Sequence, residues 1–482
     1  MGLKSGEYGA KKQFLERFPD AFVRSPSMFD LRAALEAPHS SCVCVIDGNV
    51  EMMSAPAAVT SFEDFVRFFK FKIISAIDVA QHVIVVFDEP EHLTEAKKEE
   101  QAKRDAARQR SVPACSNDLV NWPTDDNFSH EQLRGPCVDI QRLFKSRATR
   151  SRTIDAICME TLECIYNCRI KNRPRESRPS LTFDGVDERG AHRPIRERRV
   201  PAIVSTETIL KENLKRDVPM GEGDLKITST HLKIQSLRNE GCPLLQNVDV
   251  CFLMTIDTDS LLIELLQQSK KNEDELLDET KNDQLKTILC LKERSQKRKV
   301  DGDDTNEGGC ILCVDLERLE SDVGEFLMPR RPDGKICSPR GRWRAIALLS
   351  AGLALSGCDF VELKGLRADF VFEAAREVCQ EHTKLLKHME NVNRADPEQV
   401  INSLPAIRRL VRIVHVALEN APRMQRSAIS VGNYDKFHLL RAAWTVSYWS
   451  FNEQIAITKF GFVASQSSDL EMVPKPPLEK KE

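Results

Sequence analysis

The expected fold is decided by residues 248–266, VDVCFLMTIDTDSLLIELL. An apolar run rich in strand-favouring residues ends abruptly in Asp257 and Asp259, and a second apolar run follows at once. This pattern predicts a buried strand that leads into a turn carrying two carboxylates. Such close carboxylates repel each other unless a cation lies between them, and Mg²⁺ prefers oxygen ligands. The alternative is a solvated turn whose aspartates cap the next helix.

Two further predicted strands end in an acidic residue. Residues 42–46 form a β-rich run that is closed by Asp47, and residues 83–87 form another that is closed by Asp88. The amphipathic segment 61–80 between them has the length of a crossover helix. Strand, helix and strand in this order predict a right-handed βαβ unit whose strand ends meet at one edge of a parallel sheet.

Three more acidic residues occupy breaks that contain glycine. Glu222 and Asp224 lie in the sequence GEGD before a predicted helix, and Asp359 follows Gly357 after a long apolar helix. Acids at a helix N-terminus also complement the helix dipole, but a glycine before each acid favours close approach of the backbone to a ligand. The candidate catalytic and metal-binding residues are therefore Asp47, Asp88, Glu222, Asp224, Asp257, Asp259 and Asp359.

Seven carboxylates gathered at one sheet edge need cations to neutralise their charge. The fitting chemistry is two-metal phosphodiester hydrolysis with Mg²⁺, or with Mn²⁺ in its place. One ion then activates water and the other stabilises the leaving oxygen. The sequence contains neither a P-loop nor a GxGxxG motif that would indicate a different phosphate chemistry.

The composition describes a globular, charge-rich chain of 482 residues, with 41% hydrophobic and 30% charged residues. A net charge of -3 gives no global basic footprint, so contacts to nucleic acid must come from local basic segments. Fifteen cysteines without a metal-binding or disulfide pattern indicate free thiols. We expect a reducing intracellular compartment, nucleus or cytoplasm (of the host cell for a viral protein), and no membrane segment.

A charge-dense helical segment directly follows Asp88 and contains Lys97, Lys98 and Arg104. Alternating charges of this kind are typical of a solvated helix, but here they also lie next to the acidic edge, where cations bind phosphates. The predicted organisation is an N-terminal nuclease region (1–110), a basic, partly disordered insertion (111–200), the continued nuclease core (201–267), a disordered charged insertion (268–309), the end of the core with a helical hairpin and helical C-terminal region (310–462), and a disordered tail (463–482).

The order of the motifs resembles the flap-endonuclease and 5′→3′ exonuclease superfamily, which has a PIN-like domain. The matching motifs are MG at the start, VIDG, VVFD with the basic helix, GEGD, TIDTD, and SGCDF followed by KGL. GEGDLKI is similar to a motif of Xrn-type exoribonucleases. SGCDF with KGL looks more like the flap-endonuclease branch and its divergent members in large DNA viruses, such as the poxviral one.

The resemblance implies an α/β, Rossmann-like, mostly parallel sheet flanked by helices and followed by a helical region. It implies a structure-specific nuclease that acts on branched or 5′-ended DNA in replication, repair or recombination. The seven acids would bind two ions, and Gly2, Lys97, Lys98 and Arg104 would contact nucleic acid. One alternative is an Xrn-like 5′→3′ exoribonuclease with RNA as substrate. The other is an inactive scaffold of the same fold that only binds nucleic acid.

Overall fold

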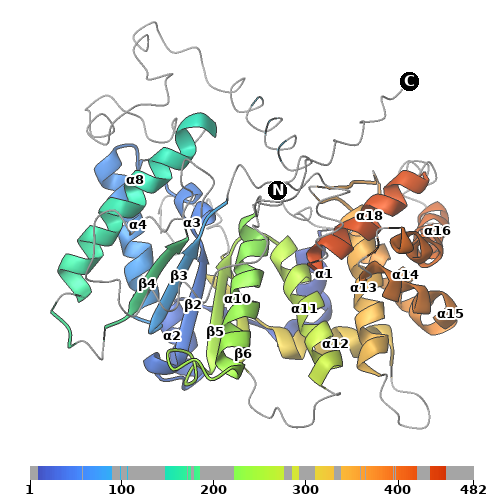
Figure 1. The fold of residues 1–482 in the computed structure, drawn as a ribbon. Coiled ribbons are helices and arrows are strands. Elements are labelled where there is room, and N and C mark those ends of the chain that lie inside the picture. The colour runs from blue at the N-terminus through green and yellow to red at the C-terminus, as the bar shows by residue number, and fades with distance from the viewer. Residues whose placement is uncertain are drawn as a thin grey trace, which may run out of the picture.

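A seven-stranded mixed sheet forms the centre of the computed structural model, and helices flank it (Figure 1). The strand order is β1-β7-β6-β5-β2-β3-β4. The strands are β1 Phe22–Ser25, β2 Cys42–Asp47, β3 His82–Val86, β4 Ser180–Asp184, β5 Val250–Thr255, β6 Lys286–Lys292 and β7 Ile311–Asp315. The structure describes residues 9–56, 58–88, 147–170, 172–174, 178–184, 222–275, 285–292, 310–329, 338–358, 360–363, 365–393, 398–420 and 435–451, with the isolated residues 98, 102, 106 and 396.

The strands from β6 to β4 in the spatial order run parallel, whereas β7 and β1 add an antiparallel edge. The central strands β2, β3 and β5 are buried along their whole length. Strands covered on both faces need apolar residues at successive positions, which explains their continuous hydrophobic runs. The mostly parallel α/β sheet flanked by helices that the sequence predicts is confirmed.

Two apolar cores lie on the two faces of the sheet. One core contains side chains of α2 Met28–Ala34, α4 Phe62–Ile77 and α8 Arg147–Ile165. The other contains side chains of α1 Ala10–Arg17, α10 Gly223–Asn239, α11 Asp259–Glu275, α12 Leu316–Leu327 and α13 Pro339–Leu355. The short helix α3 Gly48–Met53 directly follows β2.

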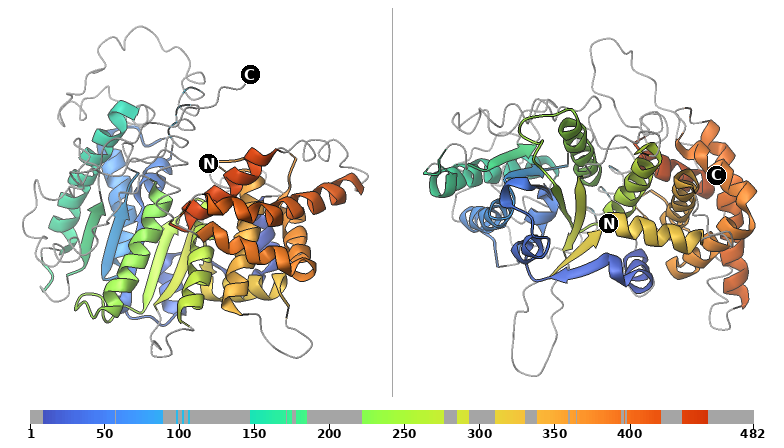
Figure 2. Two further views of the ribbon diagram at one scale, coloured as in Figure 1. Left: turned by 45° about the vertical axis from the view of Figure 1, so that its right-hand side comes forward. Right: turned by 90° about the horizontal axis from the view of Figure 1, so that it is seen from below.

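The elements described after β7 are helices, and Figure 2 shows those beyond α13 grouped at one end of the molecule. They are α14 Ala368–Glu381, α15 Thr383–Leu386, α16 Leu404–Asn420 and α18 Lys436–Trp449. Short helical turns are η1 Pro19–Ala21, η2 His39–Ser41, η5 Tyr166–Ile170, η9 Lys387–Asn393 and η10 Gln399–Ser403. α13 packs against α11, α14 and α18, so it connects this group to the sheet layer. No helix in the described part of the chain is both long and apolar enough to cross a membrane.

Two expectations about insertions need correction. Residues 180–184 form β4 within the expected basic insertion at 111–200. Residues 286–292 form β6, a buried strand between β5 and β7, within the segment 268–309 that was expected to be disordered. In KTILCLK, a lysine at each end flanks a short apolar run. The run is long enough for a strand but too short to outweigh the many charged residues around it in a hydrophobicity pattern. The sheet therefore takes strands from both segments.

Candidate metal centre

Three predicted aspartates follow three neighbouring parallel strands at the same sheet edge. Asp47 ends β2 and lies beside Val86 of β3, and Asp88 follows Val86 by two residues. On the other side of β2, Asp257 follows the last residue of β5 by two residues. The parallel directions of β5, β2 and β3 thus bring these carboxylates to one edge, as the sequence pattern indicates.

The start of α10 meets two of these carboxylates. The backbone N–H of Gly223 donates a hydrogen bond of 2.7 Å to Asp88 Oδ1. A Cβ atom on Gly223 would lie 3.1 Å from Asp88 Oδ1 and 3.5 Å from Asp47 Oδ2. Both carboxylates therefore approach the same backbone position, and glycine leaves the space that they occupy.

Asp47 combines a structural contact with an unfavourable electrostatic environment. One oxygen, Oδ1, accepts a hydrogen bond of 3.0 Å from the backbone N–H of Val50 and caps α3. The residue is only 4% exposed. Burial, followed by the charge of Asp88, raises the pKa of Asp47 well above its ordinary value, and Asp257 raises it further. This capping contact uses only one of the two carboxylate oxygens of Asp47.

Asp47, Asp88 and Asp257 form no ion pair with a lysine, arginine or histidine among the described residues. A buried or half-buried carboxylate normally has such a partner or is neutralised by a proton or a metal ion. Their donor atoms are carboxylate oxygens, which are the ligands that Mg²⁺ and Mn²⁺ prefer. The donor set at this edge therefore fits a hard divalent cation.

Two hydroxyl groups hold Asp224 in the first turn of α10. Ser260 Oγ donates to Asp224 Oδ1 at 2.5 Å, and Thr255 Oγ1 donates to the same oxygen at 3.5 Å. Thr255 Oγ1 also accepts a hydrogen bond of 3.2 Å from the backbone N–H of Asp257. The hydroxyls therefore connect the GEGD acid to the TIDTD turn. Neither hydroxyl was predicted from the sequence, although both lie within or next to the TIDTD motif.

The acids Glu222 and Asp259 are both buried and both lie at helix N-termini. Glu222 is the N-cap of α10, and Asp259 is the first residue of α11. The positive ends of the two helix dipoles stabilise negative charge there. The hydroxyl group of Tyr448, on α18, donates to Glu222 Oε1 at 3.4 Å. This contact brings a residue of the last described helix to the acidic edge, and no motif in the sequence indicates it.

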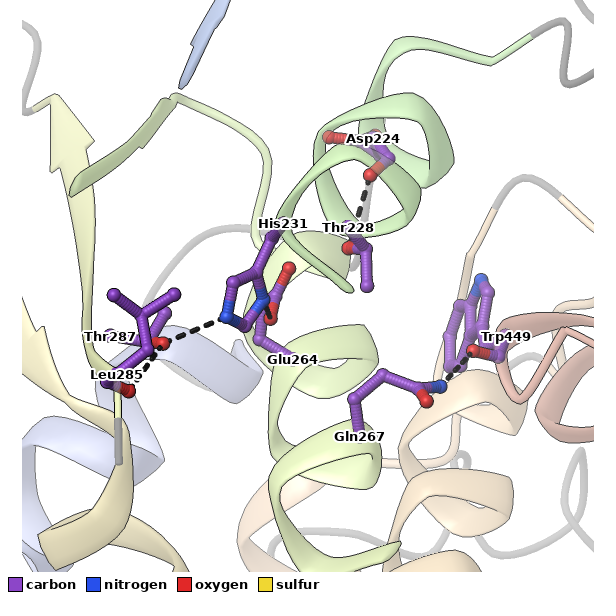
Figure 3. Close-up of polar contacts among 8 residues, drawn as sticks. All are labelled: Asp224, Thr228, His231, Glu264, Gln267, Leu285, Thr287 and Trp449. Atoms are coloured by element: carbon purple, nitrogen blue, oxygen red, sulfur yellow. Dashed lines mark hydrogen bonds and ion pairs between the residues drawn. The ribbon is translucent and has the colours of Figure 1, made fainter. Parts of the chain in front are cut away.

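A buried polar network supports α10 two turns below Asp224 (Figure 3). The His231 ring contacts Glu264 Oε2 of α11 through Nδ1 at 3.2 Å and Thr287 Oγ1 of β6 through Nε2 at 2.8 Å. Thr228 Oγ1, one turn from Asp224, donates to the backbone carbonyl of Asp224 at 3.3 Å. Polar contacts thus join α10 to a neighbouring helix and to the sheet.

Several predicted site residues lie outside the described residues, namely Gly2, Lys97, Arg104 and Asp359. Lys98 is one of the isolated described residues and is helical and half-buried. The structure therefore brings together Asp47, Asp88, Glu222, Asp224 and Asp257, places Asp259 two residues beyond Asp257, and leaves the nucleic-acid contacts as predictions.

A different group has the ligand atoms closest together. Among the described residues, Glu377, Glu381 and His382 have ligand atoms that all lie within 4.8 Å of one another, a spacing that could hold a metal ion. The six described acids of the sheet edge form no group of three that is this compact. However, Arg409 Nε donates to His382 Nε2 at 3.0 Å, and its guanidinium lies 3.8 Å from Glu377 Oε1. This arginine already supplies the positive charge at that group.

No protein-family model matches the chain, and no curated protein is significantly similar to it.

Proposed function

We propose that the chain is a divalent-metal-dependent nuclease that hydrolyses phosphodiesters at the edge formed by β5, β2 and β3. The observation that carries this proposal is the convergence of Asp47, Asp88 and Asp257 without a basic partner among the described residues. In a structural role alone, two like charges near a buried carboxylate destabilise the fold. A role in binding cations explains why acidic residues occupy these positions.

Asp47, Asp88 and Asp257 would hold the cations most directly, with Glu222, Asp224 and Asp259 around them. When bound, two Mg²⁺ or Mn²⁺ ions supply charge stabilisation for the reacting phosphate and a nucleophilic water at neutral pH. The oxygen Asp47 Oδ2 suits this task because the cap bond to Val50 uses only Oδ1. Asp224 differs from these ligands because hydroxyl groups already bond to its Oδ1. We assign Asp224 to orienting the site.

The chain's own residues fix the carboxylates before any ligand binds. The Gly223 N–H orients Asp88, the Val50 N–H orients Asp47, and Ser260 orients Asp224. Side chains held in this way lose little conformational freedom when a ligand binds, which favours catalysis. The helix N-termini at Glu222 and Asp259 point partial positive charge at the same edge.

We propose that the substrate is DNA with a flap or a free 5′ end and that the domain has a PIN-like arrangement. Both proposals rest on the order of the sequence motifs, which includes SGCDF and KGL. The test is cleavage of a panel of flapped, nicked and single-stranded DNA, and of single-stranded RNA, with Mg²⁺ and with EDTA. The parent should cleave flapped or 5′-ended DNA only with Mg²⁺. Cleavage of RNA alone would instead assign the chain as an exoribonuclease.

The same panel of substrates tests the roles of individual acidic residues. Asp88→Ala and Asp257→Asn should each lower the cleavage rate at least 100-fold while the circular dichroism spectrum stays unchanged, because each removes a ligand charge. Glu377→Gln is the matched control, since it removes a carboxylate from the arginine-paired group instead. Full activity in both sheet-edge variants would overturn the proposed centre. Nucleic-acid binding by a parent that neither cleaves nor binds Mg²⁺ would indicate a scaffold.

A further inference from the structure

A large groove opens beside the candidate metal centre. Its volume is about 1120 Å³, and its walls come from α2, α3, α4 and the ends of β5, β6 and β7. Asp257 lines it next to the carboxylate edge, and Asp78, at the C-terminal end of α4, also lines it. The groove therefore extends from the acidic edge along α4.

Exposed apolar side chains concentrate in this groove. Phe71 is 66% exposed, Phe29 is 55% exposed and Met53 is 50% exposed, and all three line the groove. They are half of the exposed large hydrophobic side chains among the described residues, the others being Val23, Val416 and Phe437. Single exposed apolar residues are ordinary, but several along one groove indicate a surface that binds something.

Two lysines, Lys72 and Lys292, line the same groove. The Lys72 ammonium lies 5.3 Å from the ring centroid of Phe68, and no carboxylate lies at ion-pair distance from it among the described residues. Lys292 forms an ion pair with Glu51, which is almost fully buried. Burial, and then the nearby charge of Lys292, lowers the pKa of Lys72. Because Lys292 is paired with Glu51, Lys72 is the lysine of this groove whose charge an anion would neutralise.

Aromatic side chains next to lysines are the surface that binds single-stranded nucleic acid, because bases stack on the rings and phosphates bind the ammonium groups. We propose that this groove binds an unpaired segment of the nucleic-acid substrate, with bases against Phe29 and Phe71 and a phosphate at Lys72. This inference rests on the proposed function and adds where the strand lies relative to the cleavage site.

The test measures binding separately from cleavage. The probe is fluorescein-labelled single-stranded oligothymidylate, titrated in EDTA and followed by fluorescence anisotropy. Phe71→Ala should weaken binding about tenfold through the loss of one stacking surface. Lys72→Gln should weaken binding and also lower the slope of log K against log salt by about 0.7, the value for one phosphate contact with a single strand.

Matched controls lie elsewhere on the surface. Phe437→Ala removes a phenylalanine that is 58% exposed on α18, and Lys436→Gln removes an exposed lysine, so both should leave the affinity unchanged. Unchanged affinity in folded Phe71→Ala and Lys72→Gln, or no binding by the parent, overturns the proposal. Unchanged affinity in both variants would indicate instead that the groove binds an apolar protein segment. Phe71- and Lys72-dependent binding by a parent that cleaves nothing would support the groove and contradict the proposed function.

Discussion

Asp47 shows how one residue serves the fold and the candidate site at once. Its Oδ1 caps α3, which is an ordinary structural role, while burial and then the charges of Asp88 and Asp257 raise its pKa. A cap needs one carboxylate oxygen and does not need two further acids beside it. The neighbours, rather than Asp47 itself, therefore distinguish a candidate metal centre from a capped turn.

The six described acids were predictable from the sequence because they follow a recognisable strand or a glycine break. Thr255, Ser260 and Tyr448 were not, since their roles depend on which side chains lie opposite them in space. Serine and threonine occur in most turns, and a tyrosine in an apolar helix has the pattern of a core residue. Only the packing of α18 near Glu222 reveals the contact of Tyr448.

His82 gives a prediction about pH. Burial lowers the pKa of His82 to about 4, and its Nδ1 lies 2.9 Å from Ser180 Oγ of β4. Because the folded state binds the proton less well than the unfolded chain, stability is full above the unfolded pKa of about 6.5 and falls as the pH drops toward 4. The loss at pH 4 is at most about 3 kcal/mol of unfolding free energy.

Urea unfolding at several pH values between 7 and 4 measures this dependence. In His82→Gln, the unfolding free energy should decrease less between pH 6.5 and 4, because the glutamine side chain does not take up a proton. His438→Gln is the control, since His438 lies in the first turn of α18 and bonds to Asp435 at the surface. An equally steep decrease in His82→Gln and the parent would contradict the assignment.

At the scale of elements, the strands that carry the acids were easier to predict than the strands that complete the sheet. β2, β3 and β5 match the predicted runs to within two residues. β4 and β6 lie in charged, low-periodicity surroundings, where a strand of five to seven residues contributes little to any pattern. Whether these segments form strands depends on their pairing with β3 and β5, which a single sequence does not show.

The polar network at His231 leads to a prediction about how much its contacts stabilise the fold around α10. His231→Leu would leave the buried Glu264 carboxylate without its partner, and Glu264 Oε1 already has no hydrogen bond. We expect a loss of about 3 kcal/mol in unfolding free energy, the cost of breaking a buried charged contact from one side. Thr287→Val removes only the hydroxyl contact and should cost about 1 kcal/mol.

A double variant separates the network from simple packing. His231→Leu combined with Glu264→Leu removes both polar groups and should recover part of the loss, since no buried charge is left unpaired. Urea unfolding of the parent, both single variants and the double variant gives the coupling energy. Additive losses would contradict a contact between the two side chains and would assign the effect to packing alone.

For the whole molecule, the candidate centre depends on parts that are far apart in the sequence. β2, β3, β5, α10 and α11 carry the acids, and Tyr448 of α18 reaches Glu222. Gln267 Nε2 of α11 also donates to the backbone carbonyl of Trp449 at 3.0 Å. Because these elements pack around shared cores, unfolding of any one of them disrupts the arrangement of carboxylates.

Mg²⁺ should therefore stabilise the whole fold. A ligand that binds only the folded state raises the unfolding free energy by about 2.7 kcal/mol at 100 times its dissociation constant. The midpoint of thermal unfolding should rise with Mg²⁺ concentration in the parent, because the ion relieves repulsion around Asp47.

Asp88→Asn keeps an acceptor for the Gly223 N–H but loses the charge, so it should be more stable than the parent in EDTA and respond less to Mg²⁺. Glu377→Gln should respond as the parent does. The reverse result, with the response lost in Glu377→Gln and kept in Asp88→Asn, would move the metal site to the group around His382.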